Sequence, residues 1–175
     1  MTESLVPKLA KVRLVVTDVD GVLTDGGVYL DNADNEWKRF NIKDGLGIKM
    51  LLQHNISVAI ITGRTSRIVS RRAKELGITH VYQGCTDKRA AFLELLEKHD
   101  VTPEETAHVG DDLPDLPLMR MAGIGVAVQD AHPFVKAHAD WITETPGGMG
   151  AFREVADTML RAQNALDSFQ QKFLR

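Results

Sequence analysis

Residues 12–26, VRLVVTDVDGVLTDG, join an apolar run to two aspartates and a glycine. The run at 12–16, which contains one arginine, is typical of a strand buried on both faces of a parallel sheet. In such sheets ligands bind at the carboxyl ends of the strands, where Asp18 and Asp20 stand. If the extended backbone continues, these side chains point to the same side and their charges repel. Bound Mg²⁺ would relieve that repulsion; a surface turn is the plainer alternative.

Further apolar runs alternate with helical patterns along the chain. Strands are expected at 57–62, 80–82, 106–109, 124–128 and, weakly, 141–142. Helices are expected at 45–54, 66–76, 88–99, 115–122 and 133–137. This alternation predicts an α/β, Rossmann-like parallel sheet with helices on both faces. With 175 residues, we expect one domain over the whole chain.

One segment breaks the alternation. Residues 27–40, GVYLDNADNEWKRF, contain two short strand-like pieces around the turn residues 31–35. They predict a β-hairpin inserted after the first strand. A lone hairpin is marginal in water, so this one needs a partner in the main body or in another subunit. Tyr29, Trp37 and Phe40 make a protein–protein contact there plausible.

The C-terminal segment, 146–175, begins with a glycine-rich turn at 146–150. The apolar spacing of Phe152, Val155, Met159 and Leu166 then predicts a helix. In one interpretation the helix packs on the sheet and the glycines lead into it. In the other, the segment is a mobile tail that reaches an active site. The sequence does not favour either interpretation.

Polar groups after other predicted strands would meet Asp18 and Asp20 at one edge of the sheet. Thr62 ends the strand at 57–62, and Gly63 and Arg64 follow it, where a hydroxyl and a backbone N–H near a helix start can bind an anion. An ordinary helix start is the alternative. Lys88 stands at another helix start, where its positive charge opposes the helix dipole at a cost of about 0.3–1 kcal/mol. A nearby anion would offset that cost.

A second acidic cluster follows the strand at 106–109. Asp111, Asp112 and Asp115 lie within five residues and have no adjacent cation. A capped loop would explain Asp115 but not the other two. With the groups above, they make a hard-cation site, a phosphate cradle, a lysine and a candidate nucleophile. This combination predicts phosphoryl transfer, in which an aspartate carboxylate can attack phosphorus.

The overall composition limits the class of protein. The net charge of −3 and the lack of a Lys/Arg block argue against nucleic-acid binding. No apolar stretch approaches the ~20 residues of a membrane span. The first twelve residues lack the apolar middle region of a signal peptide, so we expect a cytoplasmic protein. Cys85 is the single cysteine, which excludes an internal disulfide.

The motifs DVDGVLTDG, TGR, a lone lysine and GDDLPD, in this order and spacing, resemble those of the haloacid dehalogenase superfamily of phosphatases. DGVLTDGGVYL, FNIKDGLGIKML, ITGRTS, GDDLPDLPLM and PGGMGAFREV further resemble its family of 3-deoxy-D-manno-octulosonate 8-phosphate phosphatases, from the lipopolysaccharide sugar pathway. The resemblance covers nearly the whole chain. It implies a fold without a separate cap domain, a phosphorylated sugar-acid substrate and a homotetramer assembled through the hairpin at 27–40. The segment PGGMGAFREV is similar to a tail that covers a neighbouring site.

The resemblance also implies the catalytic groups. Asp18 would be the nucleophile that forms an aspartyl-phosphate. Asp20 would protonate the leaving sugar oxygen and then activate water as a base. Mg²⁺ would be held by Asp18, the backbone carbonyl of Asp20, and Asp111.

Other residues take supporting roles in the same comparison. Thr62 would bind the transferring phosphoryl group and Lys88 would stabilise its charge. Asp112 and Asp115 would support the metal and the lysine indirectly, through the groups that surround them. Substrate-binding candidates are Thr62, Gly63, Arg64, Lys43 and Lys88.

Two alternative functions stay open at this point. Related phosphatases act on nine-carbon sugar-acid phosphates of the KDN or sialic acid type, and the pocket determinants cannot be distinguished from sequence. Receiver domains also combine an acidic cluster, a phosphorylated aspartate, a threonine and a lysine. Their acidic pair, however, precedes the phosphorylated aspartate on a separate strand. A long-lived phospho-switch would also avoid an acid/base group such as Asp20.

Overall fold

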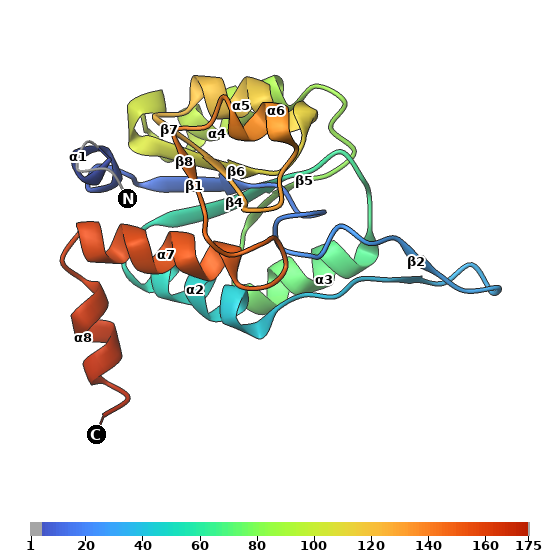
Figure 1. Cartoon of the computed structure of the whole chain (residues 1–175), viewed down its shortest axis with the longest axis horizontal. Coiled ribbons are helices and arrows are strands. Elements are labelled where there is room, and N and C mark those ends of the chain that lie inside the picture. Colours follow the sequence, from blue (N-terminus) through green and yellow to red (C-terminus); the bar gives the residue numbers. More distant parts are fainter. Residues whose placement is uncertain (1–4, 175) are drawn as a thin grey trace.

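The central element is a parallel six-stranded sheet in the order β5-β4-β1-β6-β7-β8, seen in a computed structural model that describes residues 5–174 (Figure 1). Its strands are β1 (Leu14–Thr17), β4 (Ser57–Ile61), β5 (His80–Tyr82), β6 (Thr106–Gly110), β7 (Ile124–Ala127) and β8 (Trp141–Ile142). β1 lies in the middle, with Leu14 in register with Ser57 on one side and Thr106 on the other. The predicted α/β fold is confirmed, and its strand positions agree to within two residues.

Helices cover both faces of this sheet (Figure 1). One face carries α2 (Ile42–Gln53), α3 (Arg67–Leu76) and α7 (Ala151–Ala162), and the other carries α4 (Lys88–His99) and α5 (Leu116–Met121). Alternate β1 side chains enter the two cores: Val15 packs in one, and Leu14 and Val16 in the other. This is why the strand reads as a continuous apolar run. Shorter elements are α1 (Val6–Leu9), which the sequence analysis does not predict, η1 (Pro103–Glu105), η2 (Leu113–Asp115) and α6 (Pro133–Lys136).

The expected hairpin is present as β2 (Tyr29–Leu30) and β3 (Glu36–Trp37), which pair antiparallel. Asp31 closes its turn, because its carboxylate accepts hydrogen bonds from the N–H groups of Ala33 and Asn35 at 2.8 and 2.9 Å. In Figure 1 the hairpin projects away from the sheet and its helices. Its tip therefore gains little support from the rest of this chain.

The prediction of one C-terminal helix through Leu166 is wrong. α7 ends at Ala162, and a separate helix, α8 (Leu166–Gln171), follows and turns away from it (Figure 1). Asn164 takes a left-handed conformation with φ of 57° between them. Asparagine tolerates this conformation, which ends a helix, so the apolar spacing continues across a break in the backbone.

The glycine-rich turn at 146–150 packs against the loop after β1. The Gly148 N–H donates to the Val22 carbonyl at 2.8 Å. A Cβ on Gly147 would lie 1.7 Å from the carbonyl oxygen of Gly21, so only glycine fits there. Within this chain, the turn is thus a packed connection that leads into α7.

α2 and α7 approach closely on the helical face below β1. Gly47 lies at the contact, where an added Cβ would stand 3.0 Å from Ala156 Cβ. Asp44, in the first turn of α2, reaches the start of α7 and accepts a hydrogen bond from the Arg153 N–H at 2.8 Å. Its other oxygen, Oδ2, is buried without a hydrogen-bond partner in the described part of the chain. Asp44 therefore joins the two helices while carrying a partly unsatisfied carboxylate.

Replacing Asp44 by Asn should stabilise the protein more at pH 7 than at pH 4. Burial raises the pKa of Asp44 from 3.8 to about 6, although N–H groups of Arg153, Gly150 and Phe152 partly oppose the shift. Between these values the folded state binds more protons at Asp44 than the unfolded state, so its contribution to stability falls as the pH rises. The Asn variant cannot ionise and should gain at most about 3 kcal/mol relative to the wild type across this range. Urea unfolding at both pH values measures the difference; exposed Asp100→Asn is the control, and a pH-independent gain would contradict the argument.

Candidate active site

A cavity of about 600 Å³ opens at the carboxyl end of the sheet, beside β1, β4 and β6. It collects nearly all the predicted site residues, because these strands end next to one another. Its lining includes Asp18, Asp20, Thr62, Gly63, Arg64, Lys88, Asp111, Asp112 and Asp115. Cys85 and Thr86 line it as well. Lys43 is the predicted residue that it does not contain.

Asp18 and Asp20 reach this cavity from different directions. β1 ends at Thr17, and the loop then turns so that the N–H groups of Val22, Leu23 and Thr24 all point to the Val19 carbonyl. The extended backbone does not continue through Asp20. Consequently Asp18 faces Asp111 and Asp115, while Asp20 faces a separate group of charges.

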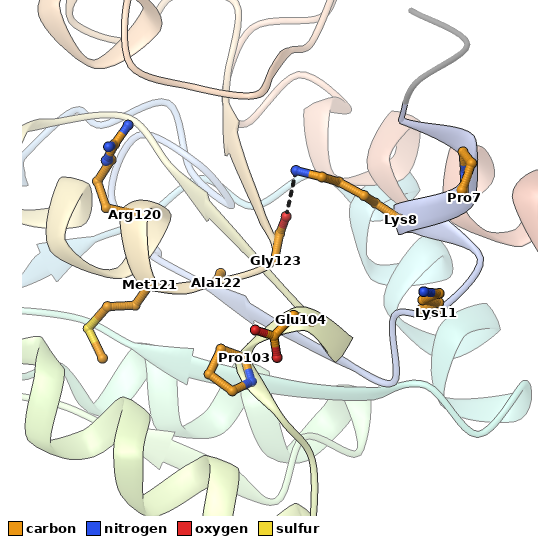
Figure 2. Close-up of a pocket in the computed structure, with 9 residues that line it drawn as sticks. All are labelled: Pro7, Lys8, Lys11, Pro103, Glu104, Arg120, Met121, Ala122 and Gly123. Carbon is orange, nitrogen blue, oxygen red and sulfur yellow. Dashed lines mark hydrogen bonds between the residues drawn. The ribbon is translucent and has the colours of Figure 1, made fainter.

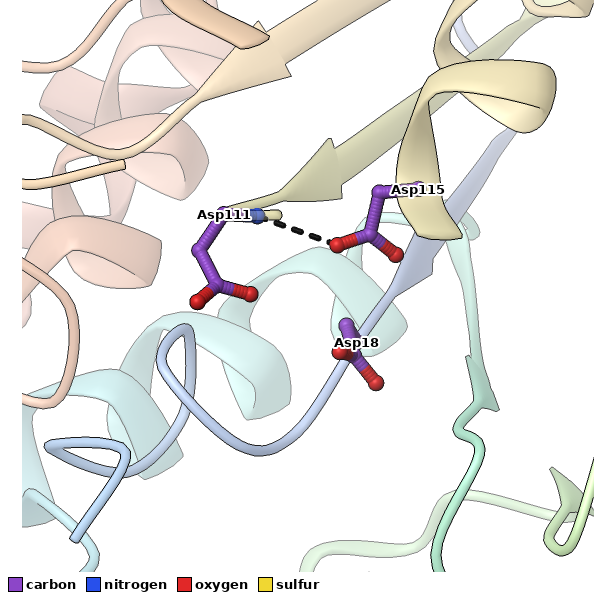
Figure 3. Close-up of side chains that lie close together, drawn as sticks. All are labelled: Asp18, Asp111 and Asp115. Carbon is purple, nitrogen blue, oxygen red and sulfur yellow. Dashed lines mark hydrogen bonds between the residues drawn. The ribbon is translucent and has the colours of Figure 1, made fainter. Parts of the chain in front are cut away.

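Asp18, Asp111 and Asp115 form an acidic cluster (Figure 3), and Lys88 lies beside two of its members. One oxygen from each carboxylate lies within 4.8 Å of the others. Lys88 Nζ stands 3.2 Å from Asp18 Oδ1 and 2.7 Å from Asp115 Oδ1. The Lys88 side chain is only 4 % exposed, so its charge and those of its partners are held out of water.

Asp115 is held in place on every side. Besides the Lys88 contact, its Oδ1 lies 3.2 Å from His108 Nε2, and its Oδ2 accepts a hydrogen bond from the Asp111 N–H at 3.1 Å. A Cβ on Gly110 would lie 2.4 Å from Asp115 Cβ, so the strand end leaves room only for glycine. Because its oxygens are already engaged, Asp115 serves as a scaffold for Lys88 and Asp111.

The pKa shifts within the cluster reflect its excess of negative charge. Burial and then repulsion from Asp115, Asp18 and Asp112 raise the pKa of Asp111 to about 8. Burial and repulsion from Asp115 also raise the pKa of Asp18, against the attraction of Lys88. Burial would raise the pKa of Asp115 as well, but hydrogen bonding to His108 and the Lys88 charge outweigh it and lower this pKa. Burial opposes the charged form of Lys88, yet Asp115 and Asp18 raise its pKa overall.

This charge count fits a divalent cation. Three carboxylates face one ammonium group, and Asp18 and Asp111 offer the oxygen donors that Mg²⁺ prefers. Asp111 is also pressed against the loop after β1: a Cβ on Gly21, whose φ is +90°, would lie 2.1 Å from Asp111 Oδ2. Glycine at this position therefore lets the loop after β1 come close to Asp111 at the end of β6, so that Asp18 and Asp111 could share one ion.

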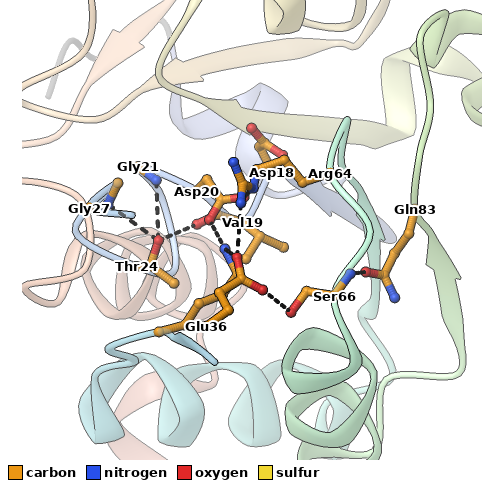
Figure 4. Close-up of polar contacts among 12 residues, drawn as sticks. Asp18, Val19, Asp20, Gly21, Thr24, Gly27, Glu36, Arg64, Ser66 and Gln83 are labelled. Carbon is orange, nitrogen blue, oxygen red and sulfur yellow. Dashed lines mark hydrogen bonds and ion pairs between the residues drawn. The ribbon is translucent and has the colours of Figure 1, made fainter. Parts of the chain in front are cut away.

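Asp20 belongs to a second, balanced group of charges at the base of the hairpin. Its Oδ1 pairs with Lys38 Nζ, and its Oδ2 lies 3.8 Å from Arg64 Nε. Glu36 Oε1 accepts a hydrogen bond from Arg64 at 2.9 Å, and its Oε2 accepts one from Ser66 at 3.0 Å (Figure 4). Burial alone would raise the pKa of Glu36, but the bonds from Arg64 and Ser66 lower it. Two carboxylates and two cations balance here, so this group does not call for a metal.

The remaining predicted residues have distinct surroundings. Thr62 is buried at the end of β4, and Gly63 and Arg64 follow it into the cavity. Asp112 is exposed and caps η2 through a hydrogen bond from the Leu113 N–H at 2.8 Å. Lys43 is exposed at the start of α2 and lines a different cavity of about 450 Å³ with Met149, Arg153 and Asp157.

Sequence reasoning misses His108, Glu36, Lys38 and Ser66. His108 lies inside β6, and nothing in its spacing indicates contact with Asp115. Glu36 and Lys38 are charged residues in a hairpin, which ordinarily face solvent. Only the folding of the hairpin base onto the loop after β1 brings them to Asp20 and Arg64, two residues that line the cavity. The alternation of Glu36 and Lys38 around exposed Trp37 is the one available signal that both point the same way.

A further cavity, of about 440 Å³, lies at the opposite end of the strands (Figure 2). Its lining includes Lys8, Lys11, Glu104 and Arg120. Lys8 is already engaged, because its Nζ donates to the Gly123 carbonyl at 3.3 Å and lies 3.6 Å from Asp140. This cavity contains none of the predicted catalytic residues.

In residues 5–174, no helix is both long enough and apolar enough to cross a lipid bilayer.

Comparison with known proteins gives consistent results. A family model described as haloacid dehalogenase-like hydrolase matches residues 79–151. The 3-deoxy-D-manno-octulosonate 8-phosphate phosphatase of Escherichia coli K12 is 49 % identical over 167 residues, which cover 95 % of this chain and 89 % of that protein. The Salmonella typhi protein of the same name is 51 % identical over 160 residues, covering 91 % and 85 % of the two chains.

Solved structures agree along the whole length. The phosphatase of that name from Moraxella catarrhalis, in complex with magnesium, phosphate and KDO, has a TM-score of 0.96 at 43 % identity, covering 99 % of both chains. The cobalt-bound enzyme from Haemophilus influenzae has a TM-score of 0.91 at 44 % identity, covering 96 % of this chain and 99 % of that one. The chain therefore belongs to the 3-deoxy-D-manno-octulosonate 8-phosphate phosphatase family of haloacid dehalogenase-like hydrolases.

Proposed function

We propose that this protein is a Mg²⁺-dependent phosphatase that hydrolyses 3-deoxy-D-manno-octulosonate 8-phosphate to KDO and inorganic phosphate. The observation that carries the proposal is the cluster of Asp18, Asp111 and Asp115 around buried Lys88. It lies in a cavity with Thr62 and Asp20, in a chain whose relatives bear that activity in their names. From the family alone we also propose that the protein acts in the lipopolysaccharide sugar pathway and lies in the cytoplasm.

Asp18 would act as the nucleophile. One of its carboxylate oxygens attacks phosphorus, and the bond from phosphorus to the sugar oxygen breaks, which leaves an aspartyl-phosphate. Lys88, 3.2 Å from Asp18 Oδ1, stands where it can neutralise charge on the transferring phosphoryl group. Thr62 can hydrogen-bond that group from the end of β4.

Asp20 would move the protons. It donates a proton to the sugar oxygen as that oxygen leaves, and then accepts a proton from water. The water oxygen bonds to phosphorus, the bond to Asp18 breaks, and phosphate and a free carboxylate result. Asp20 is suited to this role because its side chain lines the cavity outside the cluster around Lys88.

Asp18 and Asp111, with the backbone carbonyl of Asp20, are the groups we propose to hold Mg²⁺. When bound, the ion supplies positive charge beside the phosphoryl group. Asp115 and Asp112 would support this set through the backbone and Lys88.

Arg64 is the best candidate to bind an anionic group of the substrate within this chain. Its guanidinium lies beside Asp20 in the cavity and is half exposed. Lys43 lines a separate cavity, so a role in substrate binding would require the site of a neighbouring subunit.

A homotetramer built through the hairpin would bring such neighbours together. Val28, Leu30 and Trp37 are each more than half exposed, an apolar surface that water does not favour. We expect light scattering to give the mass of a tetramer for the wild type and smaller species for Leu30→Glu. Leu93→Glu, at an exposed leucine of α4, is the control and should leave the mass unchanged. A monomeric, fully active wild type would contradict the assembly.

Steady-state phosphate release tests the function. We expect many turnovers per chain with 3-deoxy-D-manno-octulosonate 8-phosphate, loss of activity with EDTA and recovery with added Mg²⁺. A nine-carbon sugar-acid phosphate, measured beside it, should be hydrolysed more slowly. A single phosphate per chain would indicate a phospho-switch, and activity that persists without metal would contradict the proposed site.

A further inference from the structure

Lys38 is a buried cation to which the mechanism above gives no role. It follows β3 at the base of the hairpin, and its side chain is only 2 % exposed. Its Nζ pairs with Asp20 Oδ1 and lies 3.5 Å from Glu36 Oε1. Removing an ammonium group from water is costly unless its partners are well placed. Because the buried ammonium group needs its carboxylate partners close by, it favours one position for each of them.

Asp20 stands between two cations that differ in exposure. The side chain of Arg64, near Asp20 Oδ2, is 49 % exposed, whereas that of Lys38 is enclosed. The Lys38 backbone is fixed between β3 and the bridge that joins Phe40 to Thr24. Thr24 in turn bonds the loop that carries Asp20, through the Gly21 N–H at 3.4 Å (Figure 4). Lys38 is thus the enclosed cation beside Asp20, held by backbone pairing on both sides.

We propose that Lys38 is a positioning residue that holds the Asp20 carboxylate where it can exchange protons in both steps of the reaction. This inference rests on the proposed function. In the first step the Asp20 proton passes to the sugar oxygen as the bond from phosphorus to that oxygen breaks. In the second, a water proton passes to Asp20 as the water oxygen bonds to phosphorus and Asp18 is released. A small displacement of the Asp20 carboxylate would slow both proton transfers.

The other interpretation is that Lys38 only anchors the hairpin. The two interpretations differ in which chemical step suffers when the lysine is removed. A sugar alkoxide needs a proton to leave, whereas the nitrophenolate of p-nitrophenyl phosphate leaves without one. Loss of positioning should therefore spare the first step with the aryl ester and slow the second. Loss of an anchor would disturb Asp18 and the metal cluster too, and would slow both.

The experiment compares Lys38→Met and Lys38→Gln with the wild type and with Arg39→Met, a neighbouring charge that is 58 % exposed. With the sugar phosphate, both Lys38 variants should lose about 10- to 100-fold in kcat and little in KM. With p-nitrophenyl phosphate, rapid mixing should show a first turnover within about 2-fold of the wild type, followed by a slow steady state. Arg39→Met should match the wild type, and thermal unfolding with and without Mg²⁺ checks that each variant folds.

Two results would overturn the inference: unchanged kcat in both Lys38 variants, or equal slowing of the first turnover and the steady state. If Lys38→Met does not fold, Lys38→Gln decides by the same comparison. Failure of the proposed function is seen separately, as a wild type that hydrolyses neither ester.

Discussion

Asp18→Asn should abolish phosphate ester hydrolysis. The amide has no negative charge and is not a nucleophile toward phosphorus, so the proposed covalent step would be lost. Removing the nucleophile of a covalent enzyme costs on the order of 10⁶-fold in kcat. Asparagine has nearly the same shape as aspartate, so it should fit beside Lys88, where the side chain of Asp18 is only 12 % exposed. The measurement is phosphate release at saturating substrate and Mg²⁺.

Acid quenching during turnover of substrate labelled on phosphorus gives a second readout. The wild type should retain label on the protein, and Asp18→Asn should retain none. Asp100→Asn is the matched control, since Asp100 is an exposed residue at the end of α4 and asparagine accepts its left-handed backbone, with φ of 48°. Substantial turnover by Asp18→Asn would show that water attacks phosphorus directly.

The elements that position Asp18 follow from local sequence. Its strand is an apolar run because β1 has a core on each face, and the runs at β4 and β6 are buried alongside it. Parallel strands that end at one edge must deliver their next residues to the same place. Thr62 and Asp111 were therefore predictable partners of Asp18 without any knowledge of long-range contacts.

The parts that sequence reasoning could not provide depend on backbone direction after an element ends. Asp18 and Asp20 serve different charge groups because the chain turns at the end of β1. The C-terminal helix breaks at Asn164 although its apolar spacing continues. His108 and Lys38 meet their carboxylate partners only across tertiary contacts. In each case the residue type permits several conformations, and packing selects one.

Replacing Lys88, the buried lysine beside the acidic cluster, should affect both catalysis and stability. In Lys88→Met, Asp18 and Asp115 lose their shared cation while remaining out of water. Breaking a buried ion pair costs about 3–5 kcal/mol, and protonation of the carboxylates can recover part of it. We therefore expect about 3 kcal/mol lower stability without metal, measured by urea unfolding in EDTA. Mg²⁺ should stabilise this variant more than the wild type, because it restores positive charge to the cluster.

The catalytic loss in Lys88→Met should persist when Mg²⁺ restores stability. The ion would neutralise the cluster, but it would not replace the ammonium group that we propose to face the phosphoryl oxygens, so kcat should stay about 10²- to 10³-fold low. Lys98→Met, on the same helix with a half-exposed side chain, should leave kcat and the response to Mg²⁺ unchanged. If Mg²⁺ restored full activity to Lys88→Met, the lysine would be a structural counter-ion alone. Its 2.7 Å contact with Asp115 would then explain its burial without any part in phosphoryl transfer.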